Sequence, residues 1–470
     1  MTEWKKTPFT ELLVDSKDGE WGEGDAAVGL REAIIIRGTD FGDINNPGAD
    51  FPKRWIKEQI VARKRLQPGD LILETAGGTS TQSTGRSVFL TKSFFDQHPD
   101  IPVLCASFSR HLRLDGGKYS SRFIGYFLQL LYRCGYMGVF NIQHTGVSRF
   151  QYTSFKNHTE LQVPDLPTQR KIAAILSAYD ELIENNKRRI ALLEKMAEEI
   201  YREWFVRLRF PGHEKVKVGK GVPQGWERLK VVMLTSYLKR GVAPKYDDSA
   251  AGVAINQKCI RDSRIDLKFA RHQSREVSTA RKIRFGDVLV NSTGEGTLGR
   301  VAQVLVPIEN CIVDSHVTIV RPKDEVPVHY FGMTLKAWEQ HFVIMGRGAT
   351  NQTELAPSVI GGVEVVMPTK QLAEAFELQA APMFAQVTQL AAQNEILVKT
   401  RDRLLPRLIS GKLSVDDLDI QFPSGMTEEM KKDEPSCAQK KTTNSGYLKG
   451  GRVERCSAKA ILKCPKKSDS

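Results

Sequence analysis

Two stretches of this chain decide how it folds, because each repeats the other. Residues 68–79 read Pro-Gly-Asp-Leu-Ile-Leu-Glu-Thr-Ala-Gly-Gly-Thr, and residues 285–297 read Phe-Gly-Asp-Val-Leu-Val-Asn-Ser-Thr-Gly-Glu-Gly-Thr. In both, a Gly-Asp turn leads into a short apolar strand, which ends in a loop of glycine and hydroxyl residues. An internal repeat has to be recognised before single elements are assigned, because it determines the whole architecture.

The repeat extends well beyond these two stretches. Gly69 and Gly286 follow a tryptophan by 65 and 60 residues, respectively. Further on, a Gly-Val-Ser or Gly-Ala-Thr loop precedes Pro167 by 21 residues and Pro368 by 20. A long helical pattern follows each of these prolines. Four matches in the same order indicate a duplicated unit, made of a strand-rich domain and a helix.

The fold class expected from this pattern is α+β, with two similar strand-rich globular domains separated by two long helices. The expected segments are a first domain at 1–165, a first spacer helix at 166–207, a linker at 208–222, a second domain at 223–367, a second spacer helix at 368–412, and a basic, disordered tail at 413–470. Turn residues separate short strands in both domains. The predicted strands are Ala33–Arg37, Asp70–Leu73, Arg86–Leu90 and Val103–Ser107, then Val253–Asn256, Asp287–Val290, Arg300–Val306 and His316–Val320, with a buried helix at 121–135.

Both spacer helices show a heptad pattern. In the first helix one row is Ile172, Tyr179, Asn186, Leu193 and Ile200, and its companion is Ile175, Leu182, Arg189 and Met196, widened by Ile183 and Ile190. In the second helix the rows are Phe376, Met383, Leu390, Leu397 and Leu404, and Ala380, Val387, Asn394, Arg401 and Leu408. Pro382 is expected to start or kink this helix, because proline lacks the amide donor. Helices of about 40 residues at ~1.5 Å per residue span roughly 60 Å.

Each helix carries one asparagine in a core row, Asn186 and Asn394. A buried asparagine lowers stability but fixes the register of a coil. The alternative is that each asparagine faces solvent at a frayed seam. An apolar stripe of this kind would be exposed in a fragment spanning 1–207, which would then be expected to pair with a second copy.

Composition restricts the class of protein. Lys and Arg number 68 against 55 Asp and Glu, which gives a net charge of +13 and favours polyanionic partners such as nucleic acid. No apolar run approaches the ~20 residues that cross a bilayer. The seven cysteines are scattered and form no C-x-x-C pair, so neither a zinc site nor a disulfide framework is expected. A cytoplasmic location with reduced thiols follows as an expectation.

The search for a catalytic centre assigns no catalytic residue and no metal ligand. The glycine-rich stretch 77–87 lacks the spacing and the lysine of a phosphate-binding loop. The chain also lacks H-E-x-x-H, G-x-S-x-G and the Asn-Pro-Pro-aromatic run of adenine methyltransferases.

Polar loops offer recognition chemistry instead, since Asn and Gln can pair with adenine and Arg with guanine in the major groove. The candidates in the first half are Thr79, Ser80, Thr81, Gln82, Arg86, Ser148, Arg149 and Gln151, and those in the second half are Asn291, Thr293, Arg300, Arg347, Thr350, Asn351 and Gln352. A basic cluster is suited to phosphate contacts and comprises Lys53, Arg54, Arg63, Lys64 and Arg65. The alternative for the polar loop residues is ordinary turn chemistry. The alternative for the basic cluster is a solvated charged face.

Two segments resemble the specificity subunit of type I restriction–modification systems. The first is Leu166-Pro-Thr-Gln-Arg-Lys-Ile-Ala-Ala-Ile-Leu, followed by Asn185-Asn-Lys-Arg-Arg-Ile-Ala-Leu-Leu. The second is Arg401-Asp-Arg-Leu-Leu-Pro-Arg-Leu-Ile-Ser-Gly-Lys-Leu at the end of the second helix. The resemblance covers about 1–418 and excludes the tail.

The resemblance implies a non-catalytic, sequence-specific DNA-binding subunit with pseudo-two-fold symmetry. Its helices would pack as an antiparallel coiled coil that sets the spacing, and each target-recognition domain would read half of a bipartite target. The implied partners are double-stranded DNA, two modification (methyltransferase) subunits that bind S-adenosylmethionine, and restriction (motor/nuclease) subunits that use ATP and Mg. The rival hypotheses are a coiled-coil scaffold with an incidental basic surface, and a stand-alone DNA nuclease or methyltransferase.

Overall fold

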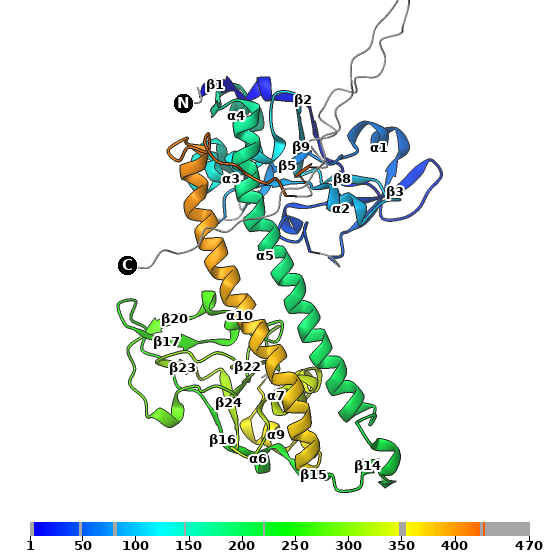
Figure 1. The fold of residues 1–470 in the computed structure, drawn as a ribbon, viewed down its shortest axis with the longest axis vertical. Coiled ribbons are helices and arrows are strands. Elements are labelled where there is room, and N and C mark those ends of the chain that lie inside the picture. The colour runs from blue at the N-terminus through cyan, green and yellow to red at the C-terminus, as the bar shows by residue number, and fades with distance from the viewer. Residues whose placement is uncertain are drawn as a thin grey trace, which may run out of the picture.

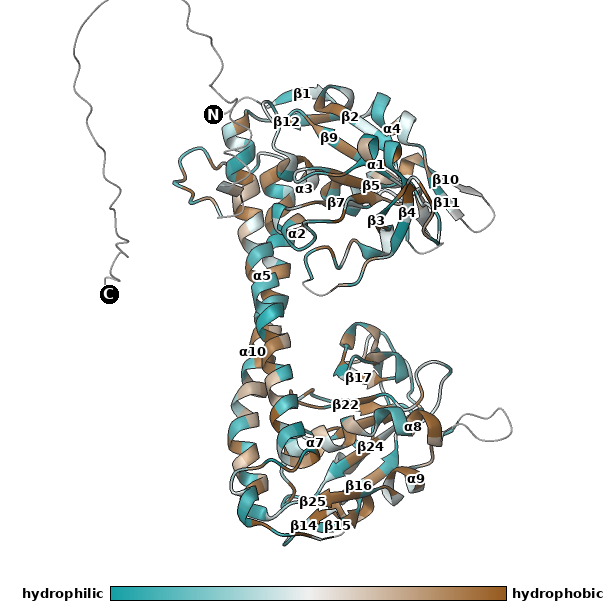
Figure 2. Cartoon of the chain, turned by 90° about the vertical axis from the view of Figure 1, so that its right-hand side faces the viewer, coloured by the Kyte–Doolittle hydropathy of each residue, from teal (hydrophilic) through white to brown (hydrophobic). Residues whose placement is uncertain are grey.

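Two α+β domains are connected by a pair of long helices in the computed structural model of the chain (Figure 1). The structure describes residues 4–46, 49–78, 82–144, 147–219, 221–346, 354–423 and 426–427. Helices α5 (Leu166–Tyr201) and α10 (Lys370–Ile409) lie side by side and run antiparallel. In Figure 2 one domain stands near each end of this coil, and both project to the same side.

The first domain is built from small sheets around the Gly-Asp strand. Its strands are β1 (Lys5–Pro8), β2 (Leu13–Asp18), β3 (Leu30–Ile36), β4 (Lys53–Lys57), β5 (Leu71–Glu74), β6 (Ala76–Gly78), β7 (Ser87–Phe89), β8 (Val103–Cys105), β9 (Ser109–Leu114), β10 (Asn141–His144), β11 (Val147–Phe150) and β12 (Glu160–Val163). Its helices are α1 (Glu58–Lys64), α2 (Lys92–Asp96), α3 (Ser121–Arg133) and α4 (Tyr152–His158). The sheet orders are β2-β9-β5-β7, β4-β3-β8, β1-β12 and β10-β11-β6.

The second domain repeats this plan. Its strands, after the hairpin β13 (Val218–Gly219) and β14 (Val222–Pro223), are β15 (Glu227–Lys230), β16 (Thr235–Arg240), β17 (Gly252–Ile255), β18 (Ile260–Arg261), β19 (Arg264–Ile265), β20 (Arg271–Gln273), β21 (Val288–Asn291), β22 (Val301–Gln303), β23 (Cys311–Val313), β24 (Val317–Pro322) and β25 (Glu364–Met367). Its helices are α6 (Val231–Leu234), α7 (Val328–Ala337), α8 (Glu339–Met345) and α9 (Pro357–Gly362). The sheet orders are β16-β24-β21-β22, β20-β17-β23, β15-β25 and β18-β19.

Three sheets of the two domains correspond strand for strand. The four-stranded orders match, and both three-stranded sheets combine one antiparallel and one parallel pair, β3 with β8 and β17 with β23. In both domains the first strand pairs with the strand that leads into the coil, β1 with β12 and β15 with β25. The duplication inferred from the sequence is therefore present in the topology.

The repeated Gly-Asp turn has the same structural task in each domain. Asp70 accepts two hydrogen bonds from the Arg113 guanidinium, at 2.8 and 2.7 Å. Asp287 accepts the same pair of bonds from Arg321, at 2.7 and 2.8 Å. Each aspartate also accepts the backbone amide three residues before it, which closes the turn. The motif thus anchors a buried strand to its neighbour.

The coil follows the heptad pattern, with one row corrected. Ile172, Asn186 and Leu193 lie on the seam as expected, and so do Ile183 and Ile190, which were expected to widen the stripe. The second row is completed by Leu176 and Ala197. Leu182 and Met196, from the expected companion row, are 45% and 52% exposed. An alternating spacing of four and three residues keeps a heptad seam facing its partner, and this seam obeys it.

Three other expectations are changed by the structure. Pro382 does not start α10, because the helix begins at Lys370 and runs through this position. The 208–222 linker holds the β13–β14 hairpin and a buried Phe210. The beginning of the 413–470 tail is ordered: Val415 is buried, and Lys171 donates hydrogen bonds to the carbonyls of Val415 and Asp416. This segment packs on the core of the first domain, next to the C-terminal end of α10.

Candidate nucleic-acid interface

The structure brings the two polar loops of the first domain together at the end of the Gly-Asp strand. β6, which follows β5 directly, pairs with β11, so that Arg149 lies opposite Ala76 and Ser148 opposite Gly78. The hydroxyl of Thr84 donates to the side-chain oxygen Oδ1 of Asn141 and lies 3.4 Å from the Ser148 hydroxyl. Loops separated by about 65 residues in the sequence therefore form a single surface.

The second domain joins its loops in the corresponding place. After β21, the Ser292 carbonyl accepts the backbone amide of Leu355 at 2.8 Å, and Thr293 forms a bridge with Glu354. The predicted contact residues Arg347, Thr350, Asn351 and Gln352 lie outside the described residues, as do Thr79, Ser80 and Thr81 in the first domain. The described segments on either side nevertheless show that both pairs of loops converge at the same end of equivalent strands.

Four of the predicted contact residues are engaged inside the protein. Arg86 forms a bidentate ion pair with the buried carboxylate of Glu74 at 2.9 and 2.6 Å, and this hydrogen bonding raises the pKa of Arg86. Asn291 is fully buried and donates to the carbonyls of Gln257 and Thr297. Arg300 donates to the carbonyls of Ile260 and Gly296, and Ser148 is buried. These four side chains support the conformation of the loops through contacts inside the protein.

Other predicted residues occupy the outer surface of the loops. Arg149 and Gln151 are exposed. Gln82 forms an isolated bridge in the loop ahead of β7. The Thr293 hydroxyl lies 2.6 Å from Nδ1 of His316 and is bound to that ring. Among the predicted loop residues that the structure describes, Gln82, Arg149 and Gln151 are therefore the exposed ones.

A hollow of about 940 Å³ beside these loops contains residues that sequence reasoning missed. Phe108, in the turn between β8 and β9, is 65% exposed, and Ile142 is 40% exposed. Arg110 places its guanidinium over the ring of Tyr152, 4.4 Å from the centroid, and pairs with Asp18. An exposed aromatic ring beside a stacked guanidinium can contact base or sugar surfaces. One feature of the sequence could have identified this aromatic residue as exposed: Phe108 lies between two serines directly after a predicted strand.

The basic cluster lies on β4 and α1, and its members differ in availability. Lys53, Arg63 and Arg65 are exposed. Lys64 instead donates to the Gly19 carbonyl and to Glu20, at 3.0 and 3.1 Å. Arg54 lies over the Trp21 ring, 4.7 Å from its centroid. Three of the five predicted phosphate ligands therefore present free surface, and two are partly occupied by internal contacts.

The two asparagines of the coil meet across the seam. Asn186, which is 3% exposed, donates from Nδ2 to Oδ1 of Asn394 at 3.0 Å. Asn394 in turn donates to the Ile183 carbonyl at 3.3 Å. About two helical turns further along, Arg401 forms an ion pair with Asp180. A buried polar pair of this kind allows one register, because any shift leaves both amides without partners.

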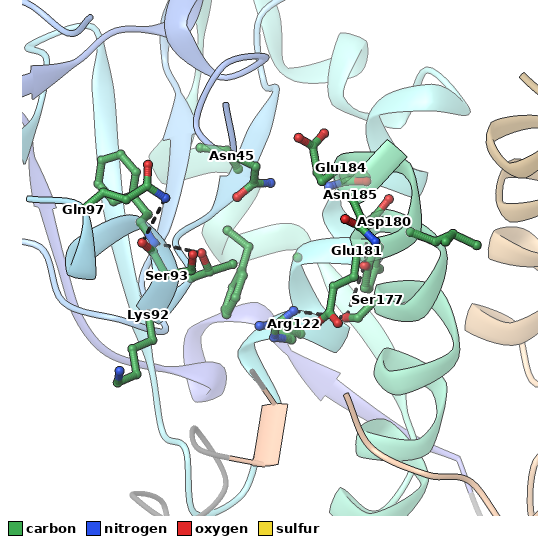
Figure 3. Close-up of a pocket in the computed structure, with 18 of the residues that line it drawn as sticks. Asn45, Lys92, Ser93, Gln97, Arg122, Ser177, Asp180, Glu181, Glu184 and Asn185 are labelled. Atoms are coloured by element: carbon green, nitrogen blue, oxygen red, sulfur yellow. Dashed lines mark hydrogen bonds between the residues drawn. The ribbon is translucent and has the colours of Figure 1, made fainter. Parts of the chain in front are cut away.

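Each domain is fastened to the coil by a polar contact. In the first domain, Tyr126 on α3 donates to Asp180 on α5 at 2.5 Å, and Arg122 donates to Ser177 at 3.2 Å (Figure 3). Burial raises the pKa of Tyr126 well above its usual value, and the Asp180 carboxylate raises it further. These residues line a pocket of about 620 Å³ between domain and coil. In the second domain the corresponding link joins α7 to α10, with Nδ1 of His329 2.6 Å from Glu377.

Within the described part of the chain, no group of three His, Cys, Asp or Glu side chains is placed to hold a metal ion. The helices that the structure describes include none that is long and apolar enough to cross a membrane. The cysteines that the structure describes are free thiols: Cys105, Cys134, Cys259 and Cys311.

Comparison with known proteins gives consistent matches. Residues 57–195 match the family described as type I restriction modification DNA specificity domain. The chain is 26% identical over 272 residues to the MjaIX specificity subunit of Methanocaldococcus jannaschii, a type I restriction enzyme subunit, with 55% of this chain and 62% of that protein covered. It is 22% identical over 327 residues to the HindI specificity subunit of Haemophilus influenzae, with 54% and 69% covered. The match therefore spans less than two thirds of the M. jannaschii protein.

Among solved structures, the S subunit of a type I restriction-modification system from M. genitalium superposes with a TM-score of 0.56. The superposition covers 87% of this chain and 96% of that one, at 15% sequence identity. At this identity the likeness concerns the fold, and it extends over both domains and the coil.

Proposed function

We propose that the chain, whose residues 57–195 match the type I restriction modification DNA specificity domain, is the DNA-reading subunit of a type I restriction–modification complex. Each α+β domain binds one half of a bipartite target through its paired loops. The coil of α5 and α10 holds the two halves at a fixed separation. The chain itself performs no chemistry on DNA.

The observation that carries this proposal is the placement of the loops. Loops rich in hydrogen-bonding groups converge at the same end of β5 and of β21, in two domains that share one topology. A scaffold would need neither paired loops nor a duplicated platform beneath them. A rigid connection between two weak readers makes the second binding event intramolecular, which raises affinity and specificity together.

Three polar contacts hold the two helices and the two domains together. The Asn186–Asn394 pair fixes the register of the coil, while Tyr126–Asp180 and His329–Glu377 fasten the domains to it. The separation of the two loop surfaces is then set by the protein, so the target should be two short sequences with an invariant gap.

The chemistry of the complex belongs to partners in this proposal. Two modification subunits would bind S-adenosylmethionine and methylate adenine, and restriction subunits would supply ATP- and Mg-dependent translocation and cleavage. This chain would hold none of these cofactors and would act in the cytoplasm.

The test is base-resolution mapping of methyladenine in the host, with the gene intact, deleted, or carrying Arg149→Ala with Gln151→Ala. The intact gene should give a bipartite motif with a constant gap, which disappears on deletion. The double variant should relax one half of the motif and leave the other unchanged, because the halves are read by separate domains. A matched control is Lys118→Ala, an exposed cation of the same domain that does not line the hollow beside the loops. A continuous motif, or loss of both halves together, would refute the proposal.

A further inference from the structure

The seam of the coil differs between the two halves of the chain at one polar position. The helices begin after equivalent N-cap residues, Asp165 and Thr369, so each position of α5 corresponds to the one 204 residues further on in α10. The paired strands that lead into them, Glu160–Val163 and Glu364–Met367, follow the same offset. Burial agrees with the correspondence, since Ile172 and Phe376, Leu176 and Ala380, and Ile183 and Val387 are all buried.

This correspondence does not place the two asparagines at equivalent positions. Asn186 corresponds to Leu390, and Asn394 corresponds to Ile190. Ile190 and Leu390 belong to one apolar cluster in the coil and form the pseudo-symmetric counterpart of the asparagine pair. The coil thus contains one polar pair and one apolar pair, related by the pseudo-two-fold axis that passes between them.

The asymmetry has a consequence for pairing with a second copy. If two copies of α5 packed in the register seen here, each Asn186 would lie opposite Ile190 of the other copy. Both amides would then be buried without a partner. Two copies of α10 would similarly place Asn394 against Leu390.

The neighbouring ion pair has the same property. Asp180 is paired with Arg401, and the position of α5 that corresponds to Arg401 is Ala197. In a pair of α5 helices Asp180 would therefore face a methyl group and lose its cation. Two independent contacts, about two helical turns apart, are satisfied only when α5 meets α10.

From this we infer that the Asn186–Asn394 pair selects α10 as the partner of α5, either α10 of the same chain or α10 of another copy. The pair rejects a second α5. The halves remain alike in topology but are not interchangeable in the coil. The inference rests on the coil alone and holds whether or not the chain reads DNA. It also opposes the expectation that the first half readily pairs with itself.

The test uses the full chain and makes the seam symmetric. Asn186→Leu with Asn394→Ile gives each helix the residue of its counterpart, so every pairing becomes apolar. Asn186→Leu alone makes α5 complementary to itself and leaves Asn394 unpaired within the chain. Ile183→Leu, one turn away in the same seam, is the matched control without a polar change.

Two measurements distinguish the outcomes. Sedimentation gives the dissociation constant of the dimer, which should fall at least about tenfold in both asparagine variants and stay at the wild-type value in the control. Cross-linking of mixed isotope-labelled chains gives the mode of pairing, because a link between Lys187 of two copies forms only when α5 meets α5. Lys187 is exposed and lies one residue from Asn186. The inference is overturned if wild type gives this link, or if the symmetric double variant dimerises no more than the control.

Discussion

Replacing Asp287 by Asn should destabilise the second domain more than Asp70→Asn destabilises the first, although the two residues make the same bonds. The side chains of Asp287 and Arg321 are 0% and 10% exposed, whereas those of Asp70 and Arg113 are 2% and 28% exposed. Breaking a buried ion pair from one side leaves a charge without compensation, which costs about 3–5 kcal/mol. Arg321 retains hydrogen bonds to the Ala280 and Lys282 carbonyls, which places the expected loss for Asp287→Asn near ~3 kcal/mol.

The corresponding loss in the first domain should be about 1–2 kcal/mol, because water reaches the Arg113 guanidinium and replaces part of the lost bonding. Urea unfolding followed by hydrogen exchange in β5 and β21 separates the two domains in one sample. Asparagine keeps the shape of the turn and the acceptor for the backbone amide, so the comparison isolates the charge. Equal losses in the two domains, or a loss below ~1 kcal/mol for Asp287→Asn, would refute the argument that burial controls the strength of this motif.

Three further outcomes are expected. The salt dependence of DNA binding should lose about 0.9 from its log–log slope in Arg63→Gln, because one phosphate contact is removed. Lys64→Gln should leave that slope unchanged, since Lys64 is paired with Glu20; equal slopes in the two variants would exclude Arg63 from the interface. Burial lowers the pKa of His111 despite nearby carboxylates, so the unfolded state takes up the proton first and stability should fall as pH drops below about 6.5. His111→Gln should reduce the difference in stability between pH 7.5 and pH 5.5, measured by urea unfolding at both values. An unchanged difference would contradict the role of His111. A chain ending at residue 412 should unfold at lower urea than one ending at 427, because Val415 and Met426 cover the core of the first domain; identical midpoints would contradict this.

Strands, helix α3 and the two spacer helices could be predicted from the sequence because each depends on local pattern. β5 and β21 were marked by the Gly-Asp turn, and α5 by its heptads. Which heptad row faces the partner was less accessible, since Leu182 and Ile183 are equally apolar and adjacent. Only the position of α10 decides that Ile183 is buried while Leu182 faces outward.

The candidate site shows a different limit. Composition identified loops rich in donors and acceptors, but it could not separate the side chains that build a loop from those that the loop presents. Arg86 and Arg149 illustrate this, because both are arginines in polar loops of the same domain. Glu74, which holds Arg86, lies twelve residues before it on the other side of the loop, and its carboxylate is buried by the fold.

The close contacts between two glycines and the backbone of other segments could not be predicted from the sequence either. A Cβ added at Gly19 would lie 2.0 Å from the Ala106 carbonyl oxygen, and one added at Gly241 would lie 2.0 Å from that of Val313. Both glycines directly follow equivalent strands, β2 and β16, so they belong to the repeat as much as the Gly-Asp turn does. A single glycine in a varied loop gives no signal by itself, and the contact that demands it comes from a strand pair about 70–90 residues further on. The duplication has therefore preserved two kinds of constraint, the buried ion pair and the glycine contact, while the loops above them have diverged. That pattern is the one expected if the platform must stay the same and only the readout is free to change.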